Sequence, residues 1–226
     1  LRVMEVALEI PTNDFSHEPA MDDEGCAEAM AFGMSAIEKG LDLFVPGEMG
    51  IGNTTSAAAI SHALYGWNAA DWTGRGTGID DTTLDRKTRV VGDAIILHKN
   101  QMHDGLDVLR CVGGREIAAM AGAIIAARFA RVPILLDGYV SCAAAAVLAA
   151  MRADALDHCL VGHVSAEPGH ARLIEKLGKE ALINFGMRLG EGSGAALAIP
   201  LLRAAAECHT GMATFEKAGI DGKEEA

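Results

Sequence analysis

The sequence has few aromatic residues and few prolines, and it has no long apolar run. Phe, Trp and Tyr make up 4% of the 226 residues, whereas half of the chain is hydrophobic. This composition excludes an intrinsically disordered chain, because such chains have too few apolar residues to form a buried core. It predicts a core of Ala, Leu, Ile and Val, with helices packed closely on a sheet. No stretch of about 18 or more apolar residues is free of charge, so no membrane-spanning helix is expected.

Positive charge is also scarce. Lys and Arg total 19 against 31 Asp and Glu, which gives a net charge of −12. This balance argues against nucleic acid or an anionic membrane as the main partner, so a phosphate ligand must rely on backbone amides and a few cations. Five cysteines are scattered without a Cys-x-x-Cys pair, and no signal peptide is expected. Reduced thiols in a cytoplasmic protein are expected.

Helical and strand-like segments alternate along the chain and are joined by short Gly-rich turns. The alternation predicts an α/β fold with a doubly wound parallel sheet, Rossmann-like and three-layered, covered on both faces. The expected helices are 25–39, 54–65, 82–100, 115–128, 141–152, 171–177 and 195–208; the expected strands are 41–45, 133–136, 159–164 and 183–189.

The ends of the chain differ from its middle. Residues 1–24 contain two prolines and an acidic cluster, which indicates an extended lead-in with a turn at 22–24 that caps the next helix. Residues 25–199 form the expected α/β domain, and 200–226 form a C-terminal helix and a frayed tail after residue 219. The sequence opens without an initiator Met, which suggests a piece of a longer protein.

Ligands of open α/β sheets bind beyond the carboxyl ends of the strands, so the turns after strands are the places to search. The turn at 46–55 reads PGEMGIGNTT. Its glycines allow a ligand close to the backbone, and the following helix offers free N–H groups to a phosphate. It lacks the Lys of a P-loop and the third Gly of a dinucleotide fingerprint. The alternative is a tight turn with Thr54 or Thr55 as the helix N-cap.

Two further turns offer weaker signals. The loop Gly74–Gly78 is rich in glycine and is followed by Lys87, which would form a second anion-binding loop, although a lone helix Lys is more often solvated. Asp137 ends a strand, where it could bind a ribose or cap a helix N-terminus.

The fourth turn places Glu191 between glycines at 190–194. A carboxylate in such an accessible position suits a general base, while Ser193 could cap the following helix. His163 and His170 lack the spacing of metal ligands, and no metal site is expected. The other two histidines considered, His98 and His103, are expected at the surface.

Together these segments resemble one enzyme family. The segments are VPGEMGIGNTTSAA from Val45, GGREIA from Gly113, LLDGY from Leu135, HVSAEPGH from His163 and LGEGSGAA from Leu189. They are similar, in the same order, to nicotinate-nucleotide:dimethylbenzimidazole phosphoribosyltransferases. The resemblance implies a doubly wound parallel sheet with a small helical domain, of which 200–226 would be part, and a homodimer. Family members are longer, so the N-terminal part is expected to be missing here.

The resemblance also implies a reaction. Nicotinate mononucleotide and dimethylbenzimidazole would give α-ribazole phosphate and nicotinate, a step in assembling the nucleotide loop of cobalamin. A benzimidazole nitrogen attacks the anomeric carbon from the face opposite to nicotinate. No cofactor and no metal are implied, since no pyrophosphate leaves.

By their positions in the motifs, Glu191 would accept the benzimidazole proton and Glu48 would be a second carboxylate near the reacting centre. The other residues that the resemblance implies bind substrate. These are Gly50, Gly76 and Lys87 for the phosphate, Met49 and Leu189 around the aromatic base, and Ile51, Asn53, Asp137 and Ser165.

Two other readings remain open. One is a nucleotide-binding homologue without catalytic activity, in which the phosphate loops persist and the base pocket is lost. The other is a phosphoribosyltransferase with a pyrophosphate donor, or a Rossmann oxidoreductase, and the missing motif residues disfavour both.

Overall fold

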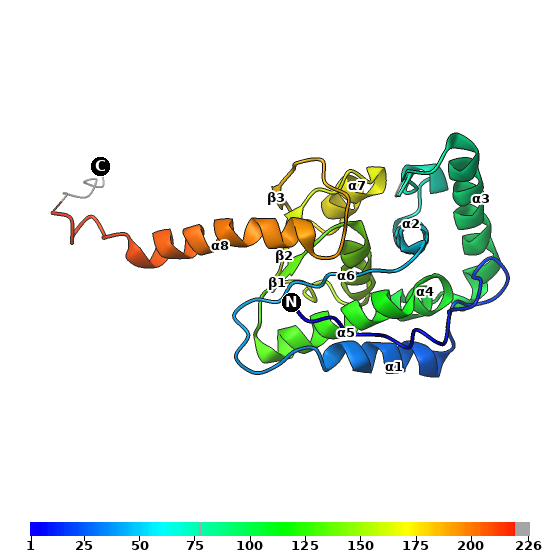
Figure 1. Cartoon of the computed structure of the whole chain (residues 1–226), viewed down its shortest axis with the longest axis horizontal. Helices are drawn as coiled ribbons and strands as arrows, with labels where there is room; N and C mark the ends of the chain where they lie inside the picture. Colours follow the sequence, from blue (N-terminus) through cyan, green and yellow to red (C-terminus); the bar gives the residue numbers. More distant parts are fainter. Residues whose placement is uncertain (77, 220–226) are drawn as a thin grey trace.

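A computed structural model describes residues 1–76 and 78–219 of the chain (Figure 1). Within these residues the helices are α1 (Asp23–Met34), α2 (Asn53–Tyr65), α3 (Asp81–His98), α4 (Gly105–Val112), α5 (Arg115–Ala130), α6 (Tyr139–Met151), α7 (Pro168–Lys176) and α8 (Ser193–Gly211). The strands are β1 (Ile134–Leu136), β2 (Cys159–His163) and β3 (Ala181–Ile183). Two short 3₁₀ turns cover Ala69–Asp71 and Lys99–Gln101.

The three strands form a small parallel sheet in the order β1-β2-β3. Leu135 lies opposite Leu160, and His163 lies opposite Ile183. On the outer side of β1, Phe44 makes one parallel bridge to Ile134 and extends the sheet by a single residue. The α/β class and the parallel sheet predicted from the sequence are therefore confirmed.

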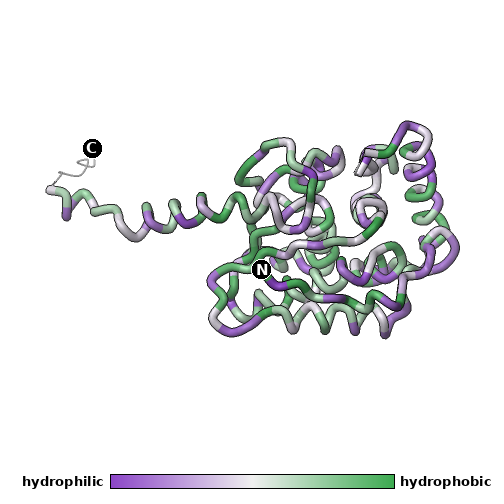
Figure 2. Tube along the Cα trace, in the orientation of Figure 1, coloured by the Kyte–Doolittle hydropathy of each residue, from purple (hydrophilic) through white to green (hydrophobic). Residues whose placement is uncertain are grey.

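Helices cover both faces of the sheet. On one face Ile134 and Leu136 belong to the main core, together with buried residues of α2, α5 and α6. On the other face Leu135 packs against Ala195 and Ala198 of α8. Beyond this contact α8 projects from the body of the molecule (Figure 1), and its hydrophobic and hydrophilic residues alternate along the projecting part (Figure 2).

Small side chains allow the helices to approach closely. Every residue of α6 from Tyr139 to Leu148 is buried, and α2, α4, α5 and α7 all pack against this helix. At the crossing of α1 and α5, a Cβ on Gly33 would lie 1.8 Å from the Ala119 carbonyl oxygen. The expected core of small and aliphatic side chains is thus present.

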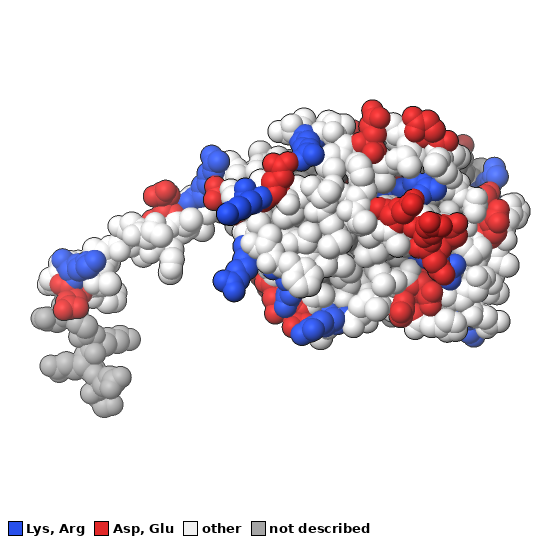
Figure 3. Space-filling model, turned by 90° about the horizontal axis from the view of Figure 1, so that it is seen from below, with Lys and Arg blue, Asp and Glu red and all other residues white. Residues whose placement is uncertain are grey.

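Acidic side chains are spread unevenly over the face shown in Figure 3. Seen from below, most acidic side chains lie toward the end of the molecule away from α8 (Figure 3). Among the described residues, no helix is both long and apolar enough to cross a membrane.

Several expected boundaries were wrong. The helix expected at 25–39 ends at Met34, and Gly40 lies in a separate turn with a φ of 90°. The expected strand 41–45 reduces to the Phe44 bridge, and the strand expected at 183–189 lies earlier, as β3. The helix α4 was not among the expected helices.

His98 corrects another expectation, because it is buried and not on the surface. Its side chain is 1% exposed, and its Nε2 lies 2.8 Å from the Phe15 carbonyl oxygen. His103 is exposed as expected. The bond between His98 and Phe15 helps to fix the lead-in segment, as does the bond from Arg115 Nε to the Ile10 carbonyl oxygen. Asp22 caps α1 as predicted, and the expected fraying of the last residues, 220–226, falls outside the described part.

Candidate active site

The turns singled out in the sequence meet at one edge of the sheet. The turn after Phe44, the residues after β1 and β2, and the turn before α8 all lie where the parallel strands end. Ligands of open α/β sheets bind at this edge. Glu48, Asp137, Ser165 and Glu191 are therefore neighbours in space, although they are spread over most of the sequence.

The turns containing Glu48 and Glu191 touch through their backbones. A Cβ on Gly47 would lie 2.6 Å from the carbonyl carbon of Glu191 and 2.7 Å from the amide nitrogen of Gly192. On the other side, a Cβ on Gly190 would lie 2.9 Å from Oε1 of Glu48. The two candidate catalytic carboxylates are thus held at the same place by direct contact between their turns.

The turn containing Glu191 has an unusual backbone. Gly190, Glu191 and Gly192 have φ values of 81°, 60° and 77°, three consecutive residues in the left-handed region. For a residue with a Cβ this conformation costs about 1–2 kcal/mol. The Glu191 side chain itself is exposed. Strain of this kind occurs mostly where surrounding contacts enforce it, and it is typical of functional turns.

Asp137 is the contact that holds this turn. The buried carboxylate accepts hydrogen bonds from Gly192 N at 3.2 Å and from Ala195 N at 2.8 Å, so it caps α8 from the end of β1. This is one of the two roles considered for Asp137. Ser193, also considered as the cap, does not cap the helix, and its hydroxyl is buried without a partner among the described residues.

Glu48 is half-buried and titrates near neutral pH. Burial, the largest effect, and the nearby carboxylates of Glu116, Asp137 and Glu191 together raise its pKa from 4.5 to about 7. A hydrogen bond from Asn53 Nδ2 to Glu48 Oε2 opposes these effects. Since the folded structure favours its neutral form, Glu48 can hold or release a proton at physiological pH.

Lys87 joins the two glycine-rich loops. Its Nζ donates to Thr54 Oγ1 and to the Gly74 carbonyl oxygen, both at 2.9 Å. The alternative of a solvated helix charge is wrong, because burial, the largest effect, lowers the pKa of this amine, while Glu167 raises it. A Cβ on Gly76 would lie 3.2 Å from the same Thr54 hydroxyl.

The N-terminus of α2 lies beside these groups and has no side-chain cap among the described residues. Its N-cap residue is Gly52, with a φ of 81°, and neither Thr54 nor Thr55 caps it as the alternative proposed. An uncapped helix N-terminus next to an ammonium group is a favourable place for an anion. Lys87, Gly76 and the N-terminus of α2 therefore lie around one region, and phosphate binding by Lys87, Gly76 and Gly50 stays a prediction.

Three large apolar side chains beside the carboxylates are exposed. Met49 is 78% exposed, Ile51 is 99% exposed and Leu189 is 68% exposed. They belong to the same two turns as Glu48 and Glu191. Exposed apolar groups that gather in one place are often part of a binding surface.

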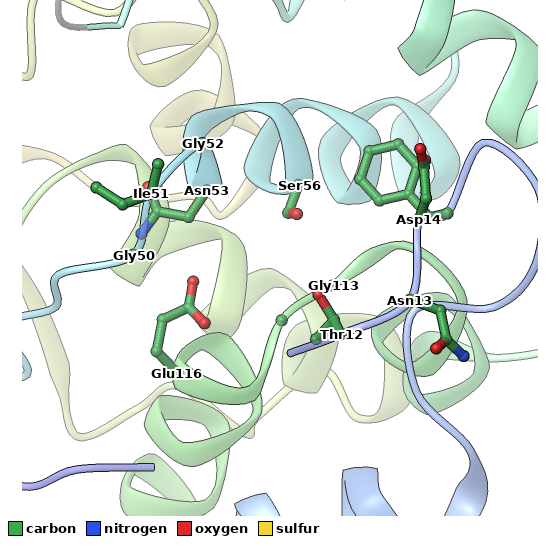
Figure 4. A pocket seen from close by; sticks show the side chains of 12 residues that line it. Thr12, Asn13, Asp14, Gly50, Ile51, Gly52, Asn53, Ser56, Gly113 and Glu116 are labelled. Atoms are coloured by element: carbon green, nitrogen blue, oxygen red, sulfur yellow. The ribbon is translucent and has the colours of Figure 1, made fainter. Parts of the chain in front are cut away.

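A cavity of about 290 Å³ opens next to this edge (Figure 4). Gly50, Ile51 and Asn53, all expected to bind substrate, line one wall. Glu116, from the first turn of α5, points toward them from across the cavity (Figure 4). Its Oε1 would lie 2.5 Å from a Cβ on Gly50.

Sequence reasoning missed several residues of this cavity. They are Thr12–Phe15, Gly52, Ser56, Gly113, Gly114 and Glu116. The pair Gly113–Gly114 before an acidic helix start was a usable signal, since the GGREIA segment was part of the resemblance. The lead-in residues offered none, because their place depends on distant contacts such as Ala20 N to Cys111 O.

Ser165, like Asp137, is buried. It is 7% exposed, and its N–H donates to His170 Nδ1 at 2.8 Å. His170 Nε2 lies 3.2 Å from Cys142 Sγ. In the described ranges, no three His, Cys, Asp or Glu side chains come together as metal ligands.

Comparison with known proteins supports one family. A family model described as phosphoribosyltransferase matches residues 2–220. A protein of Rhizobium etli strain CIAT 652 named nicotinate-nucleotide–dimethylbenzimidazole phosphoribosyltransferase is 59% identical over 223 residues, 99% of this chain. A protein of Brucella anthropi with the same name is 60% identical over 222 residues, 98% of this chain. The chain spans 66% of the length of each of these two relatives.

Solved structures agree with the sequence relatives. CobT from Thermus thermophilus superposes with a TM-score of 0.87 at 40% identity, over 93% of this chain and 64% of that one. A second structure from the same organism, titled as a nicotinate-nucleotide-dimethylbenzimidazole phosphoribosyltransferase, gives a TM-score of 0.84 at 38% identity, over 93% of this chain and 63% of that one. A family model covering nearly all of the sequence, together with this agreement in fold, shows that the chain belongs to the phosphoribosyltransferase family.

Proposed function

We propose that this chain transfers the phosphoribosyl group of nicotinate mononucleotide to dimethylbenzimidazole, giving α-ribazole phosphate and nicotinate. The main observation is the pair Glu48 and Glu191, held together at the sheet edge by the Gly47 contact. Lys87 and the N-terminus of α2 would supply an anion-binding region near the pair, and the exposed Met49 and Leu189 belong to the same turns as Glu48 and Glu191. The names of the relatives support the choice of substrates.

The phosphate of the nucleotide would bind between Lys87, the Gly74–Gly76 backbone and the N-terminus of α2. Among the described residues Lys87 donates hydrogen bonds only to neutral oxygens, while the charge of Glu167 raises its pKa. The chain is acidic overall, and a phosphate therefore depends on this ammonium and on backbone amides. The ribose would extend toward the cavity, where Glu116 can accept hydrogen bonds from its hydroxyls.

The benzimidazole ring would lie against Met49 and Leu189. One ring nitrogen attacks the anomeric carbon, and the bond to the nicotinate nitrogen breaks with its electron pair returning to the pyridine. The proton on the other ring nitrogen passes to Glu191, whose carboxylate is exposed at the turn. Glu48 is the second carboxyl group of the pair. It is half-buried and has a pKa of about 7, whereas Glu191 is exposed.

The proposal is tested by measuring nicotinate release from nicotinate mononucleotide, with and without dimethylbenzimidazole. Glu191→Gln preserves the shape of the side chain but cannot accept the proton, so turnover is expected to fall by about 10²- to 10⁴-fold. Glu175→Gln, an exposed Glu on α7, is the matched control and should leave turnover unchanged. Full turnover by Glu191→Gln at saturating dimethylbenzimidazole would remove Glu191 from this role.

The same assay distinguishes an active transferase from a nucleotide-binding homologue without catalytic activity. That protein would bind nicotinate mononucleotide, as measured by calorimetry, without releasing nicotinate when dimethylbenzimidazole is added.

We also infer that no metal takes part, so EDTA should leave the rate unchanged. An activity lost to EDTA and restored by Mg²⁺ would contradict this inference.

We further infer a cytoplasmic homodimer. Leu197 and Leu201 on α8 are 50% and 49% exposed, and the helix projects from the body without a partner among the described residues. A symmetric pair is the commonest way to bury such a surface. Sedimentation at micromolar concentration tests this: a single species near 23.6 kDa at every concentration would refute the dimer.

A further inference from the structure

One buried side chain behind the Glu191 turn has no partner. His163, at the carboxyl end of β2, is 1% exposed, and neither ring nitrogen makes a hydrogen bond within the described residues. A neutral imidazole always has one N–H group, so the ring buries a donor that is not satisfied. Unsatisfied buried donors are rare in folded proteins, and a histidine at such a position needs a physical explanation.

The carboxylate of Asp137 lies beside His163. Its Nε2 lies 3.6 Å from Oδ1 of Asp137, which is beyond hydrogen-bond length. The ring packs so closely on Gly194 that a Cβ there would lie 2.1 Å from its Cδ2. On a further side the ring meets His170 edge-on, with 6.2 Å between ring centroids.

His170 cannot be the missing partner. Its Nδ1 accepts the N–H of Ser165, so the proton of the neutral ring is on Nε2, which points to Cys142 Sγ at 3.2 Å. Both ring nitrogens of His170 are therefore engaged elsewhere. Asp137 remains the group toward which His163 can donate.

Asp137 links His163 to the catalytic turn. The same Oδ1 that faces the ring accepts the N–H of Ala195, and Oδ2 accepts the N–H of Gly192. A carboxylate oxygen has two lone pairs, so Oδ1 can accept from Ala195 and from a second donor together. Gly192 is the residue next to Glu191, and any shift of the Asp137 carboxylate moves the strained turn with it.

We propose that His163 is a positioning residue that acts on Glu191 through Asp137. In the tautomer with a proton on Nε2, a movement of about 0.7 Å brings the ring and Asp137 Oδ1 to hydrogen-bond length. A bond of that length would hold the Asp137 carboxylate and, through it, the Glu191 turn in place for proton transfer. The inference rests on the proposed function for the identity of the nucleotide and for the role of Glu191.

The test uses two variants of His163 and one control. Gln places a donor nitrogen near the position of Nε2, whereas Leu fills the space without a donor. His103→Leu, at an exposed histidine, is the matched control. For His163→Leu we expect kcat to fall about tenfold with KM for the nucleotide within about twofold, and for His163→Gln we expect kcat within about threefold of the wild type.

Amide hydrogen exchange gives a readout that does not need turnover. Gly192 and Ala195 donate to Asp137, so their exchange reports on this contact. Nicotinate mononucleotide should protect both amides in the wild type and in His163→Gln, but not in His163→Leu. Equal protection in the two His163 variants, free and bound, would overturn the proposal.

Failure of the proposed function gives a different result. If nicotinate mononucleotide does not bind to the wild type, the proposed function fails, and the positioning role is judged on the free protein. There the two amides should exchange faster in His163→Leu than in His163→Gln. A global loss of protection in His163→Leu would show that His163 has only a structural role, and would also overturn the proposal.

Discussion

Replacing Gly47 by Ala should separate the two candidate catalytic carboxylates without unfolding the protein. Gly47 does not have a left-handed backbone, so alanine is compatible with its conformation and only the added Cβ matters. That atom would lie 2.6 Å from the Glu191 carbonyl carbon, whereas ordinary contact begins at 3.4 Å. The neighbouring atoms belong to the backbone, so no side chain can rotate away.

The required displacement sets the expected magnitude. The two turns must separate by about 0.8 Å, and a misplacement of about 1 Å at a reacting centre lowers turnover by about 10²-fold. This corresponds to about 2.7 kcal/mol in the activation free energy. Overpacking of this kind lowers the free energy of unfolding by about 1–3 kcal/mol, which is less than the total stability of a typical domain.

The assay is nicotinate release at saturating concentrations of both substrates, with thermal unfolding of the same samples. Gly92→Ala is the control, since its Cβ would meet only the Ala69 Cβ at 3.7 Å, an ordinary contact for a residue within α3. It should keep full activity and gain about 0.8–1 kcal/mol of stability from helix propensity. A folded Gly47→Ala protein with activity within threefold of the wild type would refute the argument that this backbone contact positions the site.

Two further predictions concern charge. Glu48 has a folded pKa of about 7, above its usual 4.5, so its contribution to stability is greatest below pH 4.5 and is lost as the pH rises to 7. Glu48→Gln should therefore gain stability relative to the wild type across this interval in urea unfolding, and a difference that does not change with pH would contradict the burial of Glu48. Lys87→Ala should weaken binding of nicotinate mononucleotide by about tenfold or more in calorimetry, because one charge-assisted contact is lost. The exposed Lys99→Ala should not, and equal affinities in both variants would place the phosphate elsewhere.

The turns were predicted better than the segments between them. Short Gly-rich motifs such as that around Gly47 fix the local backbone, and local signals of this kind are present in the sequence. The helix expected at 25–39 was too long because its last residues have ordinary helix propensity. In the structure it ends at Met34, and the C-cap residue Ser35 donates its hydroxyl to the Phe32 carbonyl oxygen. Propensity is a weak guide where the chain must turn to reach the Phe44 bridge.

Residues whose role depends on distant contacts were missed for a physical reason. His98 looks like a surface residue in α3, yet it is buried by a lead-in segment 83 positions away. Glu116 begins a helix, where acidic residues are common, and only the fold places it across a cavity from Gly50. Asp137 was correctly left open between two roles, because the sequence does not reveal that the N-terminus of α8 returns to the end of β1.

The contact between Asp137 and α8 also affects how activity is lost under stress. Asp137 and Ala195 are 58 positions apart, and the residues from α5 to α7 form a contiguous block that does not need α8 for its main core. Partial unfolding starts where few buried contacts hold an element, and the described residues of α8 are buried only near its start. Detachment of this one helix would release the Glu191 turn while the rest of the fold stays intact. Heat should therefore inactivate the protein before it melts, and on cooling activity should return as soon as α8 docks again.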